Sequence, residues 1–229
     1  MLDKVKGGLI VSCQALPDEP LHSSFIMSRL AMAAKQGGSV GIRTNTPEDI
    51  NAIKQVVDLP IVGIIKKNYQ NSKVFITPTK IEILELCDSS VDMIAMDATF
   101  EERPNGESLS SIMTYIKSHY PEIQTMADIA TLEQAIEAEK LGFDCVSTTL
   151  RGYTEETLGM RNDDNDFEFV RQLVETLSIP VIAEGNIDTP EKAACCLKSG
   201  CHAVVVGGAI TRPKQITDKF VKAMSSIEA

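Results

Sequence analysis

The chain has 229 residues, of which 43% are hydrophobic, and 22 Lys+Arg against 32 Asp+Glu give it a formal net charge of −10. This composition supports a large core and excludes a compositionally disordered chain. The acidic balance argues against nucleic acid or an anionic membrane as the main partner, but a small anionic ligand responds only to local cations.

The N-terminal stretch MLDKVKGGLIVSCQ contains too short an apolar run for a signal peptide or a membrane span. The six cysteines form no C-x-x-C pair and show no His/Cys spacing typical of zinc sites. Such scattered thiols are typical of a reducing compartment. We therefore expect a cytoplasmic protein without a metal site.

Apolar, β-branched runs alternate with amphipathic stretches along the whole chain. Strands are predicted at residues 8–15, 39–44, 60–67, 92–99, 123–130, 144–150, 180–186 and 203–210. Helices are predicted at residues 25–36, 46–57, 79–87, 107–120, 131–142, 166–177, 189–200 and 212–224. Thr46, Thr131 and Thr189 stand where a helix N-cap is expected, and glycine ends the helical patterns in KQGG, KLG and KSG.

Eight strand–helix units are the number that closes a parallel (β/α)8 TIM barrel, here an α/β fold with residues 1–229 as one domain. A doubly wound open sheet is the alternative, but no G-x-G-x-x-G turn follows the first strand. Two long polar connections, residues 97–109 and 151–166, follow the fourth and sixth strands. They are either lids over a site or surface decoration.

Polar residues recur at the carboxyl ends of the predicted strands, where a barrel gathers them around one pocket. They are Gln14, Arg43, Lys66, Asp97, Asp128, Thr148 or Thr149, and Glu184. Taken singly, a carboxylate there can be a helix cap and a lysine can be solvated. Because strand side chains alternate, one of the adjacent Lys66 and Lys67 should point inward and the other outward. The joint occurrence of all these polar residues at the same end of the predicted barrel favours a functional site.

Glycine-rich turns follow the last two predicted strands, in AEGN and in VVVGGAITRP. Gly207 and Gly208, with Arg212 close by, predict a phosphate site, because loops after strands 7 and 8 often bind phosphate in barrel enzymes. Cations, carboxylates and an amide beside a phosphate grip suit proton-transfer or imine chemistry on a small phosphorylated metabolite. Neither a metal nor an organic cofactor is expected.

Several motifs together resemble the N-acetylmannosamine-6-phosphate 2-epimerases of sialic acid and amino sugar catabolism. They include IVSCQALPDEPLHSS, GIRTNTPEDINAIK, PIVGIIKK, MADIATLEQA, VIAEGNIDTPE and VVVGGAITRP, and the resemblance covers nearly the whole chain. It implies a (β/α)8 barrel of the ribulose-phosphate-binding type. It also implies interconversion of N-acetyl-D-mannosamine 6-phosphate and N-acetyl-D-glucosamine 6-phosphate without an added cofactor.

The resemblance also implies roles for individual residues. The catalytic lysine and glutamate of the family match Lys66 and Glu184, and its substrate-contacting residues match Gln14, Arg43 and Asp128. Thr149 and Arg212 complete the expected substrate contacts. The phosphate grip of the family matches the backbone around Gly185, Gly207 and Gly208, and Asn186, where some relatives carry another residue, is expected beside it.

The reaction implied by the resemblance removes a proton from C2, next to the carbonyl carbon of the opened sugar. Burial and Arg43 would keep Lys66 partly neutral, so that it serves as general base. Arg43, Gln14 or protonated Glu184 would stabilise the enolate. Two alternatives stay open: a Schiff-base (class I) aldolase-type enzyme using Lys66, or a non-catalytic phosphosugar-binding barrel. A homodimer is also expected, through apolar outer helices such as residues 25–34.

Overall fold

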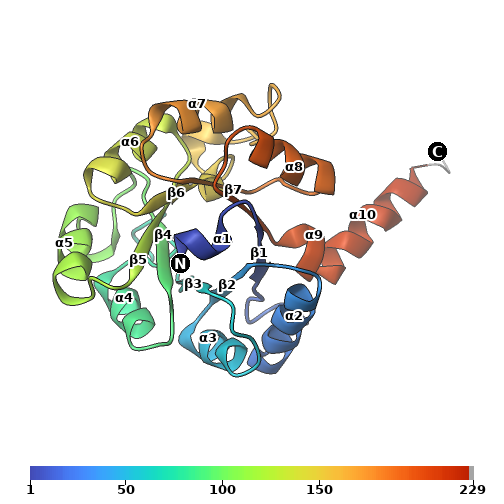
Figure 1. Cartoon of the computed structure of the whole chain (residues 1–229), viewed down its shortest axis with the longest axis horizontal. Coiled ribbons are helices and arrows are strands. Elements are labelled where there is room, and N and C mark those ends of the chain that lie inside the picture. The colour runs from blue at the N-terminus through green and yellow to red at the C-terminus, as the bar shows by residue number, and fades with distance from the viewer. Residues whose placement is uncertain (227–229) are drawn as a thin grey trace.

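The computed structural model describes residues 1–226, and its centre is a closed barrel of eight strands (Figure 1). Every strand pairs in parallel with the next along the chain, and β1 closes the ring on β8. The strands are β1 Leu9–Cys13, β2 Gly41–Asn45, β3 Ile61–Ile64, β4 Met93–Asp97, β5 Gln124–Asp128, β6 Cys145–Ser147, β7 Val181–Glu184 and β8 Ala203–Val206. The predicted (β/α)8 barrel is confirmed.

The strands are buried on both faces, which explains why their sequences are almost continuously apolar. Ile10, Val62 and Met126 belong to one buried cluster, whereas their neighbours Val11, Ile61 and Ala127 belong to the other, larger one. This alternation assigns successive side chains to the barrel interior and to the layer beneath the helices.

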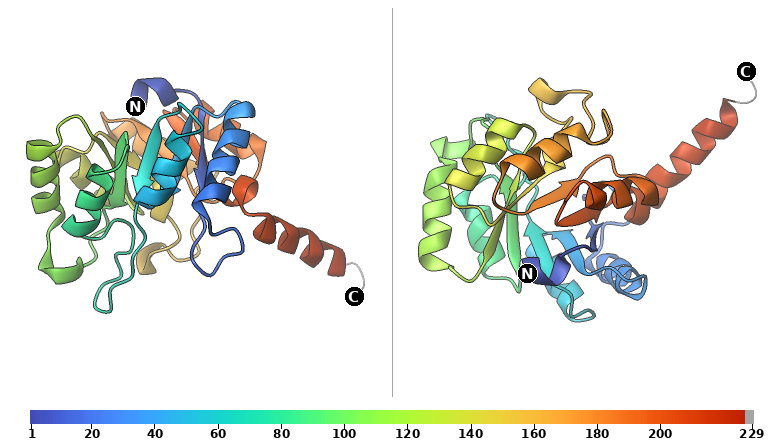
Figure 2. Two further views of the ribbon diagram at one scale, coloured as in Figure 1. Left: turned by 90° about the horizontal axis from the view of Figure 1, so that it is seen from below. Right: turned by 45° about the horizontal axis from the view of Figure 1, so that its top comes forward.

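Helices α2 to α9 surround the barrel on the outside, whereas α1 and α10 do not belong to this ring (Figures 1 and 2). The helices are α1 Leu2–Val5, α2 Ser24–Gln36, α3 Pro47–Lys54, α4 Lys80–Cys87, α5 Leu109–His119, α6 Leu132–Lys140, α7 Glu168–Thr176, α8 Pro190–Lys198, α9 Gly208–Thr211 and α10 Pro213–Ser225. Thr46, Thr131 and Thr189 are N-caps whose side chains accept hydrogen bonds from backbone N–H groups, as predicted. Helix α3 ends three residues earlier than predicted, because Val56 and Val57 both donate to the Ile53 carbonyl in a tight turn.

Helix α1 was not predicted, and it lies across the end of the barrel where the strands begin (Figure 1). The Leu2 N–H donates to Gln124 Oε1 at 3.0 Å, and the Leu2 carbonyl oxygen lies 3.0 Å from His202 Nε2. A helix of four residues is too short to show a hydrophobic period, so the sequence pattern did not reveal it.

Helix α10 leaves the barrel and projects away from it (Figure 2), and none of its residues is buried. Within residues 1–226, the ring therefore carries only the four-residue α9 between α8 and α2 (Figure 1). No helix within residues 1–226 combines the length and the hydropathy needed to cross a membrane.

Candidate active site

Most of the residues predicted for the site line one cleft of about 620 Å³. They are Gln14, Arg43, Lys66, Thr149, Glu184, Gly185, Asn186, Gly207, Gly208 and Arg212. Asp128 is fully buried instead and meets the cleft through Arg43. Asp97 is also buried away from the cleft, where its Oδ1 accepts hydrogen bonds from the N–H and the hydroxyl of Thr99.

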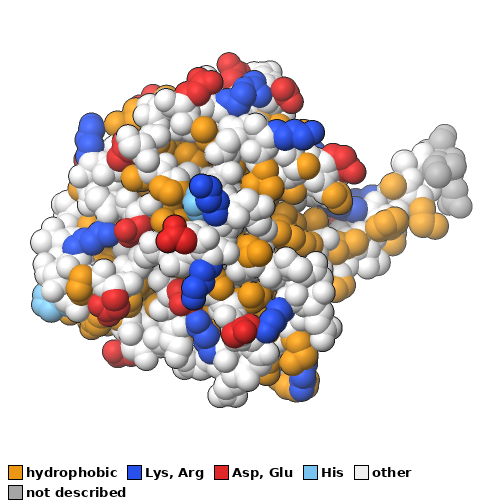
Figure 3. Space-filling view, viewed as in Figure 1, with side chains coloured by type: hydrophobic (Ala, Val, Ile, Leu, Met, Phe, Trp, Pro, Cys, Tyr) orange, Lys and Arg blue, Asp and Glu red, His pale blue; other side chains and the backbone are white. Residues whose placement is uncertain are grey.

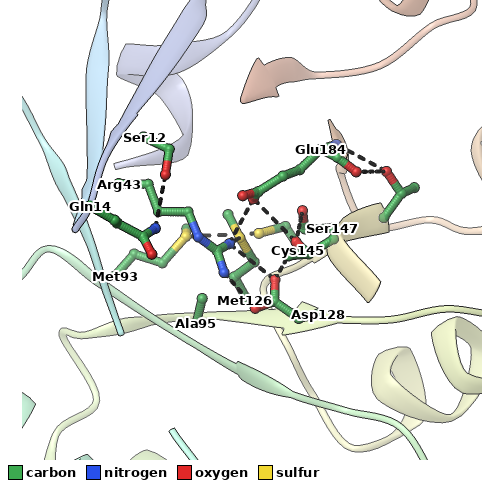
Figure 4. A network of polar contacts seen from close by, with 12 residues as sticks. Ser12, Gln14, Arg43, Met93, Ala95, Met126, Asp128, Cys145, Ser147 and Glu184 are labelled. Carbon is green, nitrogen blue, oxygen red and sulfur yellow. Dashed lines mark hydrogen bonds and ion pairs between the residues drawn. The ribbon is translucent and has the colours of Figure 1, made fainter. Parts of the chain in front are cut away.

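Arg43 is the centre of the polar network (Figure 4). It extends from β2 across the barrel to β5, where Nη1 and Nη2 donate to the two Asp128 oxygens at 3.0 and 2.6 Å. Arg43 Nη1 also lies 2.9 Å from Glu184 Oε2 at the end of β7. Burial lowers the pKa of Arg43, but the two carboxylates outweigh this effect and raise it. The guanidinium therefore stays charged.

Glu184 is held between Arg43 and the Thr149 hydroxyl. Thr149 Oγ1 lies 2.7 Å from Asp128 Oδ1 and 3.1 Å from Glu184 Oε2. One hydroxyl proton can serve only one of these two oxygens, so a protonated Glu184 would satisfy the second contact. Burial raises the pKa of Glu184, the negative Asp128 adds to this rise, and the total exceeds the lowering by Arg43. Glu184 is therefore suited to hold a proton.

Lys66 stands just beyond β3, with its backbone fixed and its side chain in the cleft. The Lys66 N–H donates to Asn45 Oδ1 at 2.8 Å, and an antiparallel bridge joins Lys66 to Ile76. Within residues 1–226, no hydrogen bond or ion pair engages its Nζ, which leaves the amine open to the cleft. Burial first, and then the charges of Arg43 and Arg212, lower the pKa of Lys66 to about 8.

Gln14 faces the same cleft from the end of β1 (Figure 4). Its Nε2 donates to Ser12 Oγ at 2.8 Å. Its buried Oε1 has no hydrogen-bond partner among the described residues. Unpaired buried oxygens are uncommon in folded proteins, so a ligand donor at this place would remove a cost to the fold.

The turns after β7 and β8 form the side of the cleft suited to a phosphate. Gly185 has φ +100°, a conformation that residues with a side chain rarely adopt, and Gly207 is the N-cap of helix α9. The first N–H groups of a helix lack partners within it and favour an anion. Arg212 also lines this side and pairs with Glu19 from the loop before α2.

Asn162 holds the backbone at the end of β7 on this side of the cleft. The sequence pattern does not identify it. The residue is buried, and its Nδ2 donates to the carbonyl oxygens of Glu184 at 2.6 Å and Gly185 at 2.9 Å. The chain therefore turns at a fixed place directly after the glutamate.

Further cleft residues lie on loops. Tyr153 and Arg161 come from the predicted lid at residues 151–166, and Arg161 Nη1 donates to Asn186 Oδ1 at 3.3 Å. Phe75 comes from the loop after β3, which the sequence pattern did not mark as part of the site. The other predicted lid, residues 97–109, contributes nothing to the lining of this cleft.

Within residues 1–226, His, Cys, Asp and Glu side chains form no group of three that could hold a metal ion. The side chains that are present supply an amine with a lowered pKa, an acid with a raised pKa and a permanent cation. This set can move a proton next to a carbonyl and stabilise the resulting negative charge.

Comparison with known proteins places this arrangement in a family. Residues 27–226 match the family described as "Putative N-acetylmannosamine-6-phosphate epimerase". The chain belongs to this family. It is 57% identical over 224 residues to a protein of Shouchella clausii named "Putative N-acetylmannosamine-6-phosphate 2-epimerase", covering 98% of both chains. A protein of the same name from Enterobacter sp. is 59% identical over 226 residues, covering 99% of this chain and 96% of the relative.

One solved structure agrees with this membership, and a second shares the fold. The N-acetylmannosamine-6-phosphate 2-epimerase of Clostridium perfringens superposes with a TM-score of 0.93 at 56% identity, covering 97% of this chain and 96% of that one. Thiamine phosphate pyrophosphorylase of Pyrococcus furiosus superposes with a TM-score of 0.61 at 20% identity, covering 94% and 91%. The second match shows only that the barrel fold is shared.

Proposed function

We propose that the protein interconverts N-acetyl-D-mannosamine 6-phosphate and N-acetyl-D-glucosamine 6-phosphate by removing and returning the C2 proton. The observation that supports this most directly is that Lys66, Glu184 and the phosphate-type turns at Gly185 and Gly207 share one cleft. Family membership at more than half identity supports the same reaction. In this proposal the enzyme acts in the cytoplasm, as one domain, in amino sugar and sialic acid catabolism.

In the proposed mechanism the phosphate occupies the turns after β7 and β8, and this fixes the distance from C2 to Lys66. Neutral Lys66 takes the C2 proton of the open-chain sugar, and the electron pair moves toward the C1 oxygen. Arg43 and Gln14 lie in the same cleft and would stabilise the resulting enolate. Glu184 moves protons during ring opening or at the opposite face of C2.

The Schiff-base alternative uses the same lysine as a nucleophile. A neutral amine with a pKa of about 8 would suit either role. The alternative requires an imine between Lys66 and the sugar, which borohydride reduces to a stable secondary amine. Incubation with substrate and borohydride followed by mass spectrometry should leave Lys66 unmodified if it acts by direct proton transfer.

The experiment that tests the function is NMR of N-acetylmannosamine 6-phosphate with the enzyme in deuterated water. The proposal predicts appearance of N-acetylglucosamine 6-phosphate with deuterium at C2 in both epimers. Binding without turnover would instead favour the non-catalytic phosphosugar-binding barrel and would overturn the proposal.

We also propose that the enzyme is a homodimer in which α10 of each copy packs on the other copy. Phe220, Val221 and Met224 of α10 are 67%, 54% and 68% exposed. Hydrophobic side chains lie along α10 where it leaves the body of the molecule (Figure 3). Within residues 1–226, the four-residue α9 is the only helix of the ring between α8 and α2, and we propose that α10 of the other copy packs at this place. On α2, the helix predicted from sequence as part of the interface, Met27 and Ala31 are buried against its own barrel, whereas Phe25 is 65% exposed.

A further inference from the structure

The second lysine of the pair, Lys67, points away from the cleft and toward helix α4. Its Nζ donates to Glu82 Oε1 at 2.8 Å, and the Tyr69 hydroxyl donates to the same oxygen at 2.8 Å. Glu82 Oε2 accepts from the Thr79 N–H at 2.9 Å and from the Thr79 hydroxyl at 2.5 Å. The Glu82 side chain thus accepts four hydrogen bonds, and it is fully buried.

This carboxylate joins the two ends of the loop that follows Lys66. Lys67 and Tyr69 belong to the start of the loop, and Thr79 caps α4 at its end. Between them the chain folds back on itself, because the Lys67 N–H donates to the Phe75 carbonyl at 2.9 Å and the Thr77 N–H donates to the Ile65 carbonyl at 2.7 Å. Lys66 lies between these two backbone contacts.

The pKa shifts of Glu82 and Lys67 indicate that their ion pair is strong. Burial alone would raise the pKa of Glu82, but hydrogen bonds from Lys67, Thr79 and Tyr69 outweigh burial and lower it. The bond to Glu82 likewise raises the pKa of Lys67. A buried carboxylate that loses one charged partner is costly to the fold, so the loop is expected to rearrange when Lys67 is replaced.

We propose that the contact of Lys67 and Tyr69 with Glu82 positions Lys66 for its reaction. The inference rests on the proposed function, in which Lys66 is the base. Adjacent residues in extended backbone face opposite ways. Fixing Lys67 on the outer side therefore fixes the direction in which Lys66 enters the cleft. Lys67, Tyr69 and Glu82 are positioning residues, since none of them lines the cleft.

The test is steady-state kinetics of Lys67→Met, Tyr69→Phe and Glu82→Gln with N-acetylmannosamine 6-phosphate. Misplacing a reacting group by about 1 Å costs roughly 100-fold in rate, so a partial loosening in Lys67→Met should lower kcat about 10-fold. KM should change less than about twofold, because the phosphate turns are untouched. Lys67→Arg, which keeps the charge, should recover part of kcat.

The matched control is Lys73→Met in the same loop. Lys73 pairs with Glu155 at 2.7 Å and Glu101 at 3.6 Å on the surface, and none of the three lines the cleft. Its kcat should stay within about twofold of the wild type, since exposed ion pairs contribute little. Circular dichroism at the assay temperature checks that each variant is folded. Tyr69→Phe removes a single hydroxyl and remains informative if Glu82→Gln does not fold.

Wild-type kcat in folded Lys67→Met and Tyr69→Phe would overturn the inference. The inference would also be overturned if the loss of kcat in Lys67→Met matched the fraction of that variant that is unfolded. It would likewise be overturned if Lys73→Met lost as much kcat as Lys67→Met. Failure of the proposed function gives a different result: the wild-type enzyme itself would not turn over the sugar. Wild-type turnover with unaffected Lys67 variants would remove only the inference.

Discussion

Arg43 and Asp128 form a two-pronged ion pair across the inside of the barrel, with N–O distances of 3.0 and 2.6 Å between groups that are 85 residues apart in sequence. Both side chains are almost fully withdrawn from solvent, at 1% and 0% exposure. Glu184 approaches the same guanidinium at 2.9 Å. Arg43 therefore compensates the Asp128 carboxylate and orients Glu184, the acid of the proposed reaction.

Arg43→Met should destabilise the fold strongly, because it leaves Asp128 and Glu184 beside each other without their cation. Breaking a buried ion pair typically costs about 3–5 kcal/mol. Urea unfolding followed by circular dichroism measures this loss. Lys35→Met is the control, since Lys35 pairs with Asp58 on the surface and should change stability by less than about 1 kcal/mol. Equal, small effects of both substitutions would show that the buried network contributes little.

Lys66→Ala should abolish deuterium exchange at C2, because the cleft then lacks its amine base. Substrate binding should persist, since Arg212 and the glycine turns remain. General base catalysis contributes about 10²–10⁴-fold, so the exchange rate should fall by at least about 100-fold, to near the background rate. NMR in deuterated water measures exchange, and calorimetry measures binding. Exchange at the wild-type rate in Lys66→Ala would assign the base to another residue.

The pH dependence should reflect the lowered pKa of Lys66, which is about 8. The base must be neutral, so kcat/KM should rise tenfold per pH unit below this value and level off above it. An unperturbed lysine would place the midpoint near pH 10.4 instead. Arg212→Ala removes one of the cations that lower this pKa, and its midpoint should move upward. A flat profile between pH 6 and 9 would contradict the assignment of Lys66 as base.

Arg212→Ala should also weaken binding of the phosphorylated sugar. Arg212 lines the cleft beside Gly207 and Gly208, and hydrogen bonds to charged groups contribute about 1.5–3 kcal/mol. KM should therefore rise roughly 10- to 100-fold, with kcat at saturation and high pH nearly unchanged. Inhibition by inorganic phosphate should weaken in parallel. An unchanged KM would place the phosphate elsewhere in the cleft.

The sequence predicted the barrel well because each unit carries its own local signals. Alternating strand and helix patterns, threonine caps and terminal glycines all depend on neighbours in the chain. The cleft could be predicted for a related reason: parallel strands bring their carboxyl ends together once the fold is known. Gln14, Arg43, Lys66 and Glu184 are all found there.

The contacts that orient these residues could not be predicted in the same way. The amide of Asn162 and the aromatic ring of Phe75 come from loops whose path depends on tertiary packing, and no periodic pattern marks them. The burial of Asp128 beneath Arg43 likewise depends on the reach of one side chain across the barrel. The partner of the Lys67 side chain, Glu82, lies 15 residues further along on α4, a pairing that the alternation of Lys66 and Lys67 alone does not identify.

The last prediction concerns α10. Phe220→Asp should convert the dimer to a monomer, because it places a charge on the apolar face of a helix that its own barrel does not cover. Sedimentation or light scattering at several concentrations measures the change. Lys222→Asp is the control: Lys222 pairs on the surface with Asp218, so its replacement should leave the mass unchanged. A wild-type chain that is monomeric at all concentrations, or a dimer unaffected by Phe220→Asp, would place the interface away from α10.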